Sequence, residues 1–120
     1  MTIDPNIIDS AALERLQEWG GASLSNEIVR LFLEHGPARM DQIRTAVDRD
    51  ALDVPERGAH SLKSSAANVG AIHVQEAASQ LELAASGGDL ERFRGLIPGL
   101  EQAYALAARE LELVVEEGTE

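Results

Sequence analysis

The chain has 120 residues, which is enough for one domain with a modest core and too few for two. Its 21 acidic residues outnumber its 10 basic ones, and the resulting charge of −11 disfavours binding to nucleic acids or anionic membranes. The chain has no cysteine, which excludes disulfides, a thiolate nucleophile and a cysteine-based zinc site. The first ten residues lack the features of a signal peptide, and no apolar run approaches the roughly 20 residues of a membrane span. We therefore expect a cytoplasmic protein.

Composition favours an all-α fold. Apolar residues make up 44% of the chain but aromatic residues only 3%, so the core is built mainly from Leu, Ile, Val and Ala. Helix formers dominate, and few segments show the alternation or β-branched clusters of strands. The four aromatic positions on apolar faces are predicted to be core: Trp19, Phe32, Phe93 and Tyr104.

The first half of the chain predicts a short helix and a long one. Asp9 or Ser10 can cap the short helix, which Gly20-Gly21 ends. A second helix is predicted over about 23–48. Gly36-Pro37 should kink or briefly break it, because proline removes a backbone donor and clashes with the preceding turn.

The second half predicts three more helices. The third, over about 53–68, is capped by Asp50 or Asp53, of which we favour Asp53 because Pro55 then lies in the first turn. A fourth runs over 71–86 and ends at Gly87-Gly88. Asp89 caps the fifth, whose start should bend at three residues: Gly95, Pro98 and Gly99.

These elements predict an up-down-up-down four-helix bundle with a short additional N-terminal helix. Residues 1–120 then form a single domain, with an acidic, frayed tail over 116–120.

The segment 59–70 carries the main functional signal. At helical spacing it has a buried stripe of Ala59, Leu62, Ala66 and Val69. The opposite face carries His60 and Lys63 with small residues around them, among them Ser64 and Ala67. One exposed imidazole among small neighbours is what a docking surface built around a reactive histidine needs.

The chemistry of this face centres on the His60 imidazole, which at neutral pH has a lone pair able to attack phosphorus. Lys63, three residues later, can swing its ammonium towards a phosphoryl group on His60. If the third and fourth helices turn back at Gly70-Ala71, His60 faces Glu82 across the pair. A carboxylate there can hold the other ring nitrogen and orient the imidazole.

The segment Ala59-His60-Ser61-Leu62-Lys63-Ser64-Ser65-Ala66-Ala67-Asn68-Val69-Gly70 resembles the signature of histidine phosphotransfer (HPt) domains. The resemblance extends over nearly the whole chain, including Gln80-Leu81-Glu82 and Gly88-Asp89-Leu90. It implies that His60 is the phosphorylated residue, that Lys63 assists it and that Glu82 lies close to the imidazole. The chain departs from the family at Ser64, where glycine is usual.

The resemblance also implies a role and partners. His60 accepts a phosphoryl group from a receiver-domain aspartate and passes it to another receiver aspartate. The partners are response-regulator receiver domains, a hybrid histidine kinase or both, and they contact Ser64 and Ala67 around His60. We expect a monomeric carrier rather than an enzyme, with no bound cofactor or metal, because Mg²⁺ belongs to the receiver. His35, His60 and His73 lie on separate helices and do not predict a metal site.

Other functions remain open. A non-catalytic adaptor would use the same face only to dock a receiver, but it would be expected to lack His60 or Lys63. A small acidic chaperone needs only charge and helicity. A third alternative, the phosphoacceptor domain of a chemotaxis-type kinase, keeps the chemistry and changes the donor; no ATP-binding domain or linker follows in this sequence.

Overall fold

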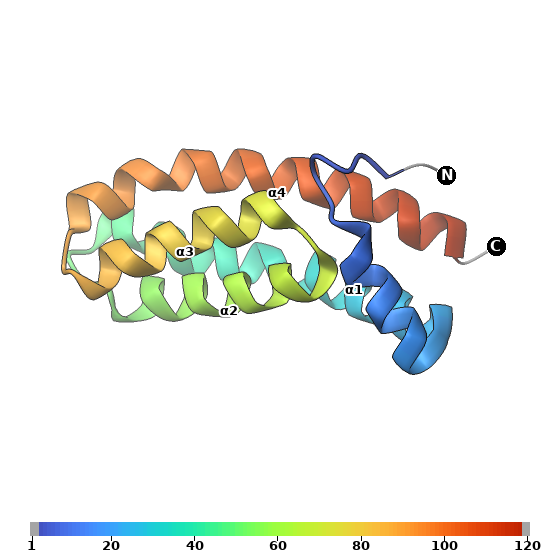
Figure 1. The fold of residues 1–120 in the computed structure, drawn as a ribbon. Helices are drawn as coiled ribbons and strands as arrows, with labels where there is room; N and C mark the ends of the chain where they lie inside the picture. The colour runs from blue at the N-terminus through green and yellow to red at the C-terminus, as the bar shows by residue number, and fades with distance from the viewer. Residues whose placement is uncertain (1–2, 119–120) are drawn as a thin grey trace.

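The computed structural model describes residues 3–118, and the side chains of residues 3–115. Within them lie four α-helices: α1 (Ser10–Asp48), α2 (Asp53–Val69), α3 (Ile72–Ser86) and α4 (Leu90–Gly118). Each helix packs against the next one in the chain and α4 packs against α1, which closes a bundle around an aliphatic core (Figure 1). The predicted all-α fold is confirmed.

The break in α1 lies at Gly20 and Gly21. Both residues have non-helical backbone angles, and Gly21 has a φ of +73°, a conformation that glycine adopts without strain. They separate residues 10–19 from the long part of the helix. Asp9 provides the cap, because its side chain accepts a hydrogen bond from the Ala11 N–H.

The predicted break at Gly36-Pro37 is wrong, because α1 stays helical there. Gly36 has another role: a Cβ at this position would overlap the Tyr104 ring of α4. The Tyr104 hydroxyl donates a hydrogen bond to the Phe32 carbonyl at 3.2 Å, and the two rings pack edge to face. α1 therefore stays helical although Pro37 removes one of its backbone hydrogen bonds, and it packs against α4 at this point.

Trp19 is not part of the core, and the prediction that placed it there is wrong. Its side chain is 76% exposed, whereas Phe32, Phe93 and Tyr104 are buried as predicted. Residues 10–19 reach past the end of the bundle (Figure 1), so the last turn before the kink has no neighbouring helix to cover it.

The other helix boundaries differ from prediction in detail. Asp53 is the first helical residue of α2 and not its cap, because the Leu52 carbonyl already accepts a hydrogen bond from the Glu56 N–H. α4 stays helical through the region where a bend was predicted, and its buried stripe continues across it: Phe93, Ile97 and Leu100. In the tail that was predicted to fray, 116–120, residues 116–118 are helical and 119–120 lie outside the described residues.

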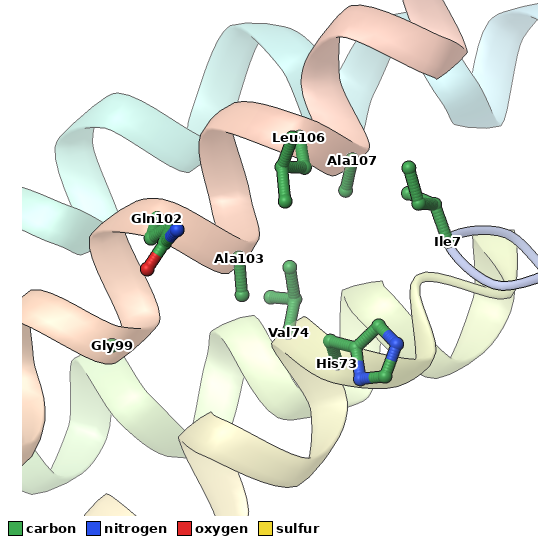
Figure 2. A pocket seen from close by; sticks show the side chains of 8 residues that line it. All are labelled: Ile7, His73, Val74, Gly99, Gln102, Ala103, Leu106 and Ala107. Carbon is green, nitrogen blue, oxygen red and sulfur yellow. The ribbon is translucent and has the colours of Figure 1, made fainter.

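The segment before α1 crosses the end of the bundle between α3 and α4. The His73 Nε2–H donates to the Asn6 carbonyl at 2.7 Å, and Ile8 forms a bridge with Ala71. A mainly apolar pocket lies beside this crossing (Figure 2), lined by Ile7, His73, Val74, Gly99, Gln102, Ala103, Leu106 and Ala107.

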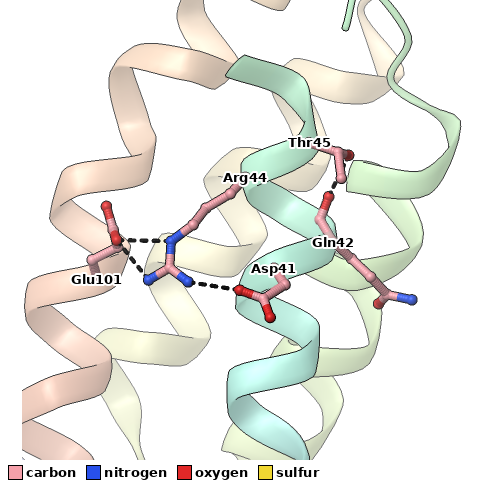
Figure 3. Close-up of polar contacts among 5 residues, drawn as sticks. All are labelled: Asp41, Gln42, Arg44, Thr45 and Glu101. Atoms are coloured by element: carbon pink, nitrogen blue, oxygen red, sulfur yellow. Dashed lines mark hydrogen bonds and ion pairs between the residues drawn. The ribbon is translucent and has the colours of Figure 1, made fainter. Parts of the chain in front are cut away.

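A polar network joins α1 to α4 on the surface (Figure 3). Arg44 donates to Glu101 through Nε at 3.0 Å and Nη2 at 2.7 Å, and to Asp41 at 3.1 Å. The hydrogen bond with Glu101 is the main cause of a raised pKa at Arg44. Because all three side chains are well exposed, we assign the network a small share of the stability.

Gly58 allows α1 and α2 to approach closely beneath the histidine face. A Cβ on Gly58 would lie 2.9 Å from Gln42 Cβ and 3.1 Å from the Arg39 carbonyl oxygen. A Cβ on Gly95 in α4, in contrast, would meet no atom within 4 Å. The sequence offered no reason for a glycine at position 58, and this contact supplies one.

These two glycines predict opposite effects of the same substitution. Gly58→Ala should lower the free energy of unfolding by about 1–2 kcal/mol, because α2 must move away from α1. Gly95→Ala should raise it by about 0.5–1 kcal/mol, because alanine is the better helix former and has room. Urea denaturation measures both, and equal stability of the two variants would contradict the close approach at Gly58.

Candidate phosphoacceptor site

The candidate site lies on the solvent side of α2. The predicted stripe of Ala59, Leu62, Ala66 and Val69 is fully buried, while the His60 side chain is 62% exposed. Buried contacts on one face of α2 therefore present the imidazole outward. On the same outer surface Ser64 is exposed and Ala67 is half-buried.

Glu82 lies against the imidazole, at the place the hairpin spacing predicted. Its Oε2 is 3.0 Å from His60 Nδ1. A carboxylate at neutral pH only accepts hydrogen bonds, so this contact places the ring proton on Nδ1. The lone pair of the neutral ring is then on Nε2.

Lys63 binds the same carboxylate. Its Nζ lies 2.7 Å from Glu82 Oε1, so the two oxygens of Glu82 contact two different side chains of α2. The Lys63 ammonium is the main cause of a lowered pKa at Glu82; partial burial opposes the shift, and the hydrogen bond from His60 adds to it. Glu82 is therefore a carboxylate at neutral pH.

A shallow pocket adjoins the imidazole towards the start of α2, lined by Asp53, Glu56, Arg57, His60, Ser61 and Glu82. Ser86 of α3 donates to Glu56 at 3.3 Å and so joins the two helices at this end. Sequence reasoning missed Glu56 and Arg57 as neighbours of the site. Their signal was their spacing, because residues three and four before His60 share its face of the helix.

The other two histidines are exposed and lie on different helices, His35 on α1 and His73 on α3. In the part of the chain that the structure describes, no three histidine, aspartate or glutamate side chains gather to hold a metal ion. Over the same residues, no helix is long and apolar enough to cross a membrane.

Three solved structures with the same fold are described as histidine-containing phosphotransfer proteins. HptB from Pseudomonas aeruginosa PAO1 is 22% identical with a TM-score of 0.87, over 95% of this chain and 98% of that one. A rice protein described as a putative histidine-containing phosphotransfer protein is 17% identical with a TM-score of 0.80, over 94% and 82%. ZmHP2 from maize is 20% identical with a TM-score of 0.80, over 95% and 88%.

Comparison with curated proteins gives no match. The model of the Hpt domain family matches residues 27–117, which is most of the chain and includes α2 and α3 entire. The chain therefore belongs to the Hpt domain family, whose members are the histidine phosphotransfer intermediates of phosphorelays.

Proposed function

We propose that His60 is the residue through which this chain carries the phosphoryl group. One observation carries the proposal: an exposed imidazole whose Nδ1 lies 3.0 Å from Glu82 Oε2, a contact that leaves the lone pair of the neutral ring on Nε2. Nε2 attacks the phosphorus of an acyl phosphate on a receiver aspartate. The N–P bond forms, the P–O bond to the aspartate breaks, and the aspartate leaves as a carboxylate. The same steps in reverse load a second receiver.

The docking surface in this proposal surrounds His60 and includes Ser64 and Ala67. A groove between α1 and α2 adjoins it and is lined by Ile28, Leu31, Phe32, His35, Gly36, Arg39, Ser61, Ser65 and Asn68. Small and apolar residues beside the histidine allow a receiver to approach closely. The receiver supplies Mg²⁺ and its own catalytic residues, and this chain acts as a monomeric cytoplasmic carrier rather than as an enzyme.

The scaffold in this proposal is a single domain over residues 1–120. Its helices run up, down, up and down, as their short connections favour. Residues 10–19 form a separate N-terminal helix beyond the kink at Gly20 and Gly21.

A panel of phosphorylated receiver domains tests the proposal. At least one receiver should transfer its phosphoryl group to the chain, and the product should be acid-labile and alkali-stable, as an N–P bond requires. Initial transfer rates then rank the receivers. A chain that binds receivers but never becomes phosphorylated would instead be an adaptor.

Lys63→Ala should shorten the lifetime of the phosphohistidine roughly fivefold without preventing its formation. The reason is that an exposed ion pair contributes up to about 1 kcal/mol, and the nucleophile itself is unchanged. The measurement is the decay of the phosphorylated chain at neutral pH. A lifetime equal to that of the native chain would remove Lys63 from the site.

A further inference from the structure

The carboxylate of Glu82 is shared between the predicted phosphoacceptor and the predicted assisting cation. Oε2 contacts His60 Nδ1 at 3.0 Å and Oε1 contacts Lys63 Nζ at 2.7 Å. The Lys63 ammonium is thus already paired before any phosphoryl group arrives. The Glu82 side chain is 22% exposed and that of Lys63 is 33% exposed, so this pair is more shielded from solvent than His60 itself.

Phosphorylation changes the charges that surround this carboxylate. Before transfer, Glu82 contacts one cation and the imidazole, which attacks in its neutral form. When Nε2 forms the N–P bond, the proton on Nδ1 remains, so the ring becomes positively charged and the phosphoryl group adds two negative charges. Two anions and two cations then share the site, and the phosphoryl group carries the larger negative charge.

We propose that Lys63 moves from Glu82 to the phosphoryl group when His60 is phosphorylated, and that Glu82 is a positioning residue which competes for Lys63. This inference rests on the proposed role of His60. In the loaded state Glu82 pairs with the Nδ1–H of the phosphorylated ring, while the flexible stem of Lys63 lets Nζ follow the phosphoryl group. Lys63 must leave Glu82 before it can bind the phosphoryl group, and this cost reduces the net stabilisation of the phosphohistidine. Transfer to the next receiver is therefore easier.

Glu82 could compete for Lys63 or simply hold it in place beside His60. These two roles predict opposite signs for the coupling between Glu82 and Lys63. If Glu82 competes for Lys63, removing the Glu82 charge releases Lys63 fully to the phosphoryl group, and Lys63 then matters more. If Glu82 merely holds Lys63 in place beside His60, removing the charge makes Lys63 matter less. Glu82 also acts directly on the His60 ring. This direct effect cancels when the effect of replacing Lys63 is compared between the native chain and a chain that lacks the Glu82 charge.

The experiment is a double-mutant cycle on the phosphohistidine lifetime, with phosphoramidate as the phosphoryl donor so that no receiver is needed. The chains are native, Lys63→Met, Glu82→Gln and the double variant. Decay at His60 is followed by mass spectrometry with residue-level assignment, and circular dichroism checks that all four chains are folded. Lys63→Met should shorten the lifetime at least threefold more in the Glu82→Gln background than in the native background.

Glu76→Gln is the matched control. Glu76 is also on α3 beside a histidine, with its Oε2 3.9 Å from His73 Nδ1. Glu76→Gln removes the same charge as Glu82→Gln, but away from His60. In that background the effect of Lys63→Met should equal its effect in the native chain. An equal or smaller effect of Lys63→Met in the Glu82→Gln background overturns the competition. Failure of the native chain to accept phosphate on His60 from any phosphorylated receiver of the panel overturns the proposed function itself.

Discussion

Replacing His60 with glutamine should abolish phosphoryl acceptance and leave the fold intact. The side chain projects from the exposed face of α2, and the buried stripe behind it is untouched, so the free energy of unfolding should change by no more than about 0.5 kcal/mol. The glutamine amide can still donate a hydrogen bond to Glu82. Its nitrogen lone pair is delocalised into the carbonyl, however, so it cannot attack phosphorus.

His73→Gln is the matched control for this variant, because His73 is an exposed histidine on α3, outside the docking surface and the groove beside it. Transfer from a phosphorylated receiver should be lost in His60→Gln and retained in His73→Gln, while urea denaturation should show the native stability for His60→Gln. Residual acceptance by the folded His60→Gln chain would mean that another residue is the acceptor.

Replacing Gly70 with alanine should destabilise the protein by about 3 kcal/mol, because strain and overlap add at this position. Gly70 ends α2 with a φ of +76°, and a Cβ there would overlap the carbonyl oxygen of Asp9. The overlap would also disturb the 2.8 Å hydrogen bond from the Asp9 N–H to the Gly70 carbonyl. The same turn sets the register between α2 and α3, and so the contact between His60 and Glu82.

Gly88→Ala separates the two causes. Gly88 has a φ of +69°, close to that of Gly70, but a Cβ there would meet no atom within 4 Å. The free energy of unfolding of Gly88→Ala should therefore fall only by the backbone strain of a positive φ, about 1–2 kcal/mol. If urea denaturation gives the same loss for both variants, the segment before α1 does not pack against Gly70 as described.

Local signals were enough to predict most of α2 and α3. The buried stripe of α2, the glycine turn at position 70 and the caps at Asp9 and Asp89 depend on neighbours a few residues away in the chain. The approach of Glu82 to His60 was also predictable, because a short turn between two helices forces residues at equal distances from it to lie opposite each other.

The mistaken predictions concern contacts between distant segments. Gly36-Pro37 looks like a helix break, but the ring of Tyr104 on α4 packs against Gly36, and no local pattern reveals that partner. Trp19 looks like a core residue because it continues an apolar stripe, yet the bundle ends before it. The pairing of Lys63 with Glu82 escaped prediction for a related reason, since it depends on how far a flexible side chain reaches across to α3.

The central claim is that the phosphoryl group resides on His60, and the most direct test is to locate it. The native chain is incubated with a phosphorylated receiver that is active in the panel, and the product is mapped at neutral pH by mass spectrometry. Heteronuclear NMR then identifies the ring nitrogen. The account predicts one phosphoryl group, on Nε2 of His60. Phosphate on His35 or His73, on Nδ1 of His60, or on no residue with any receiver would contradict it.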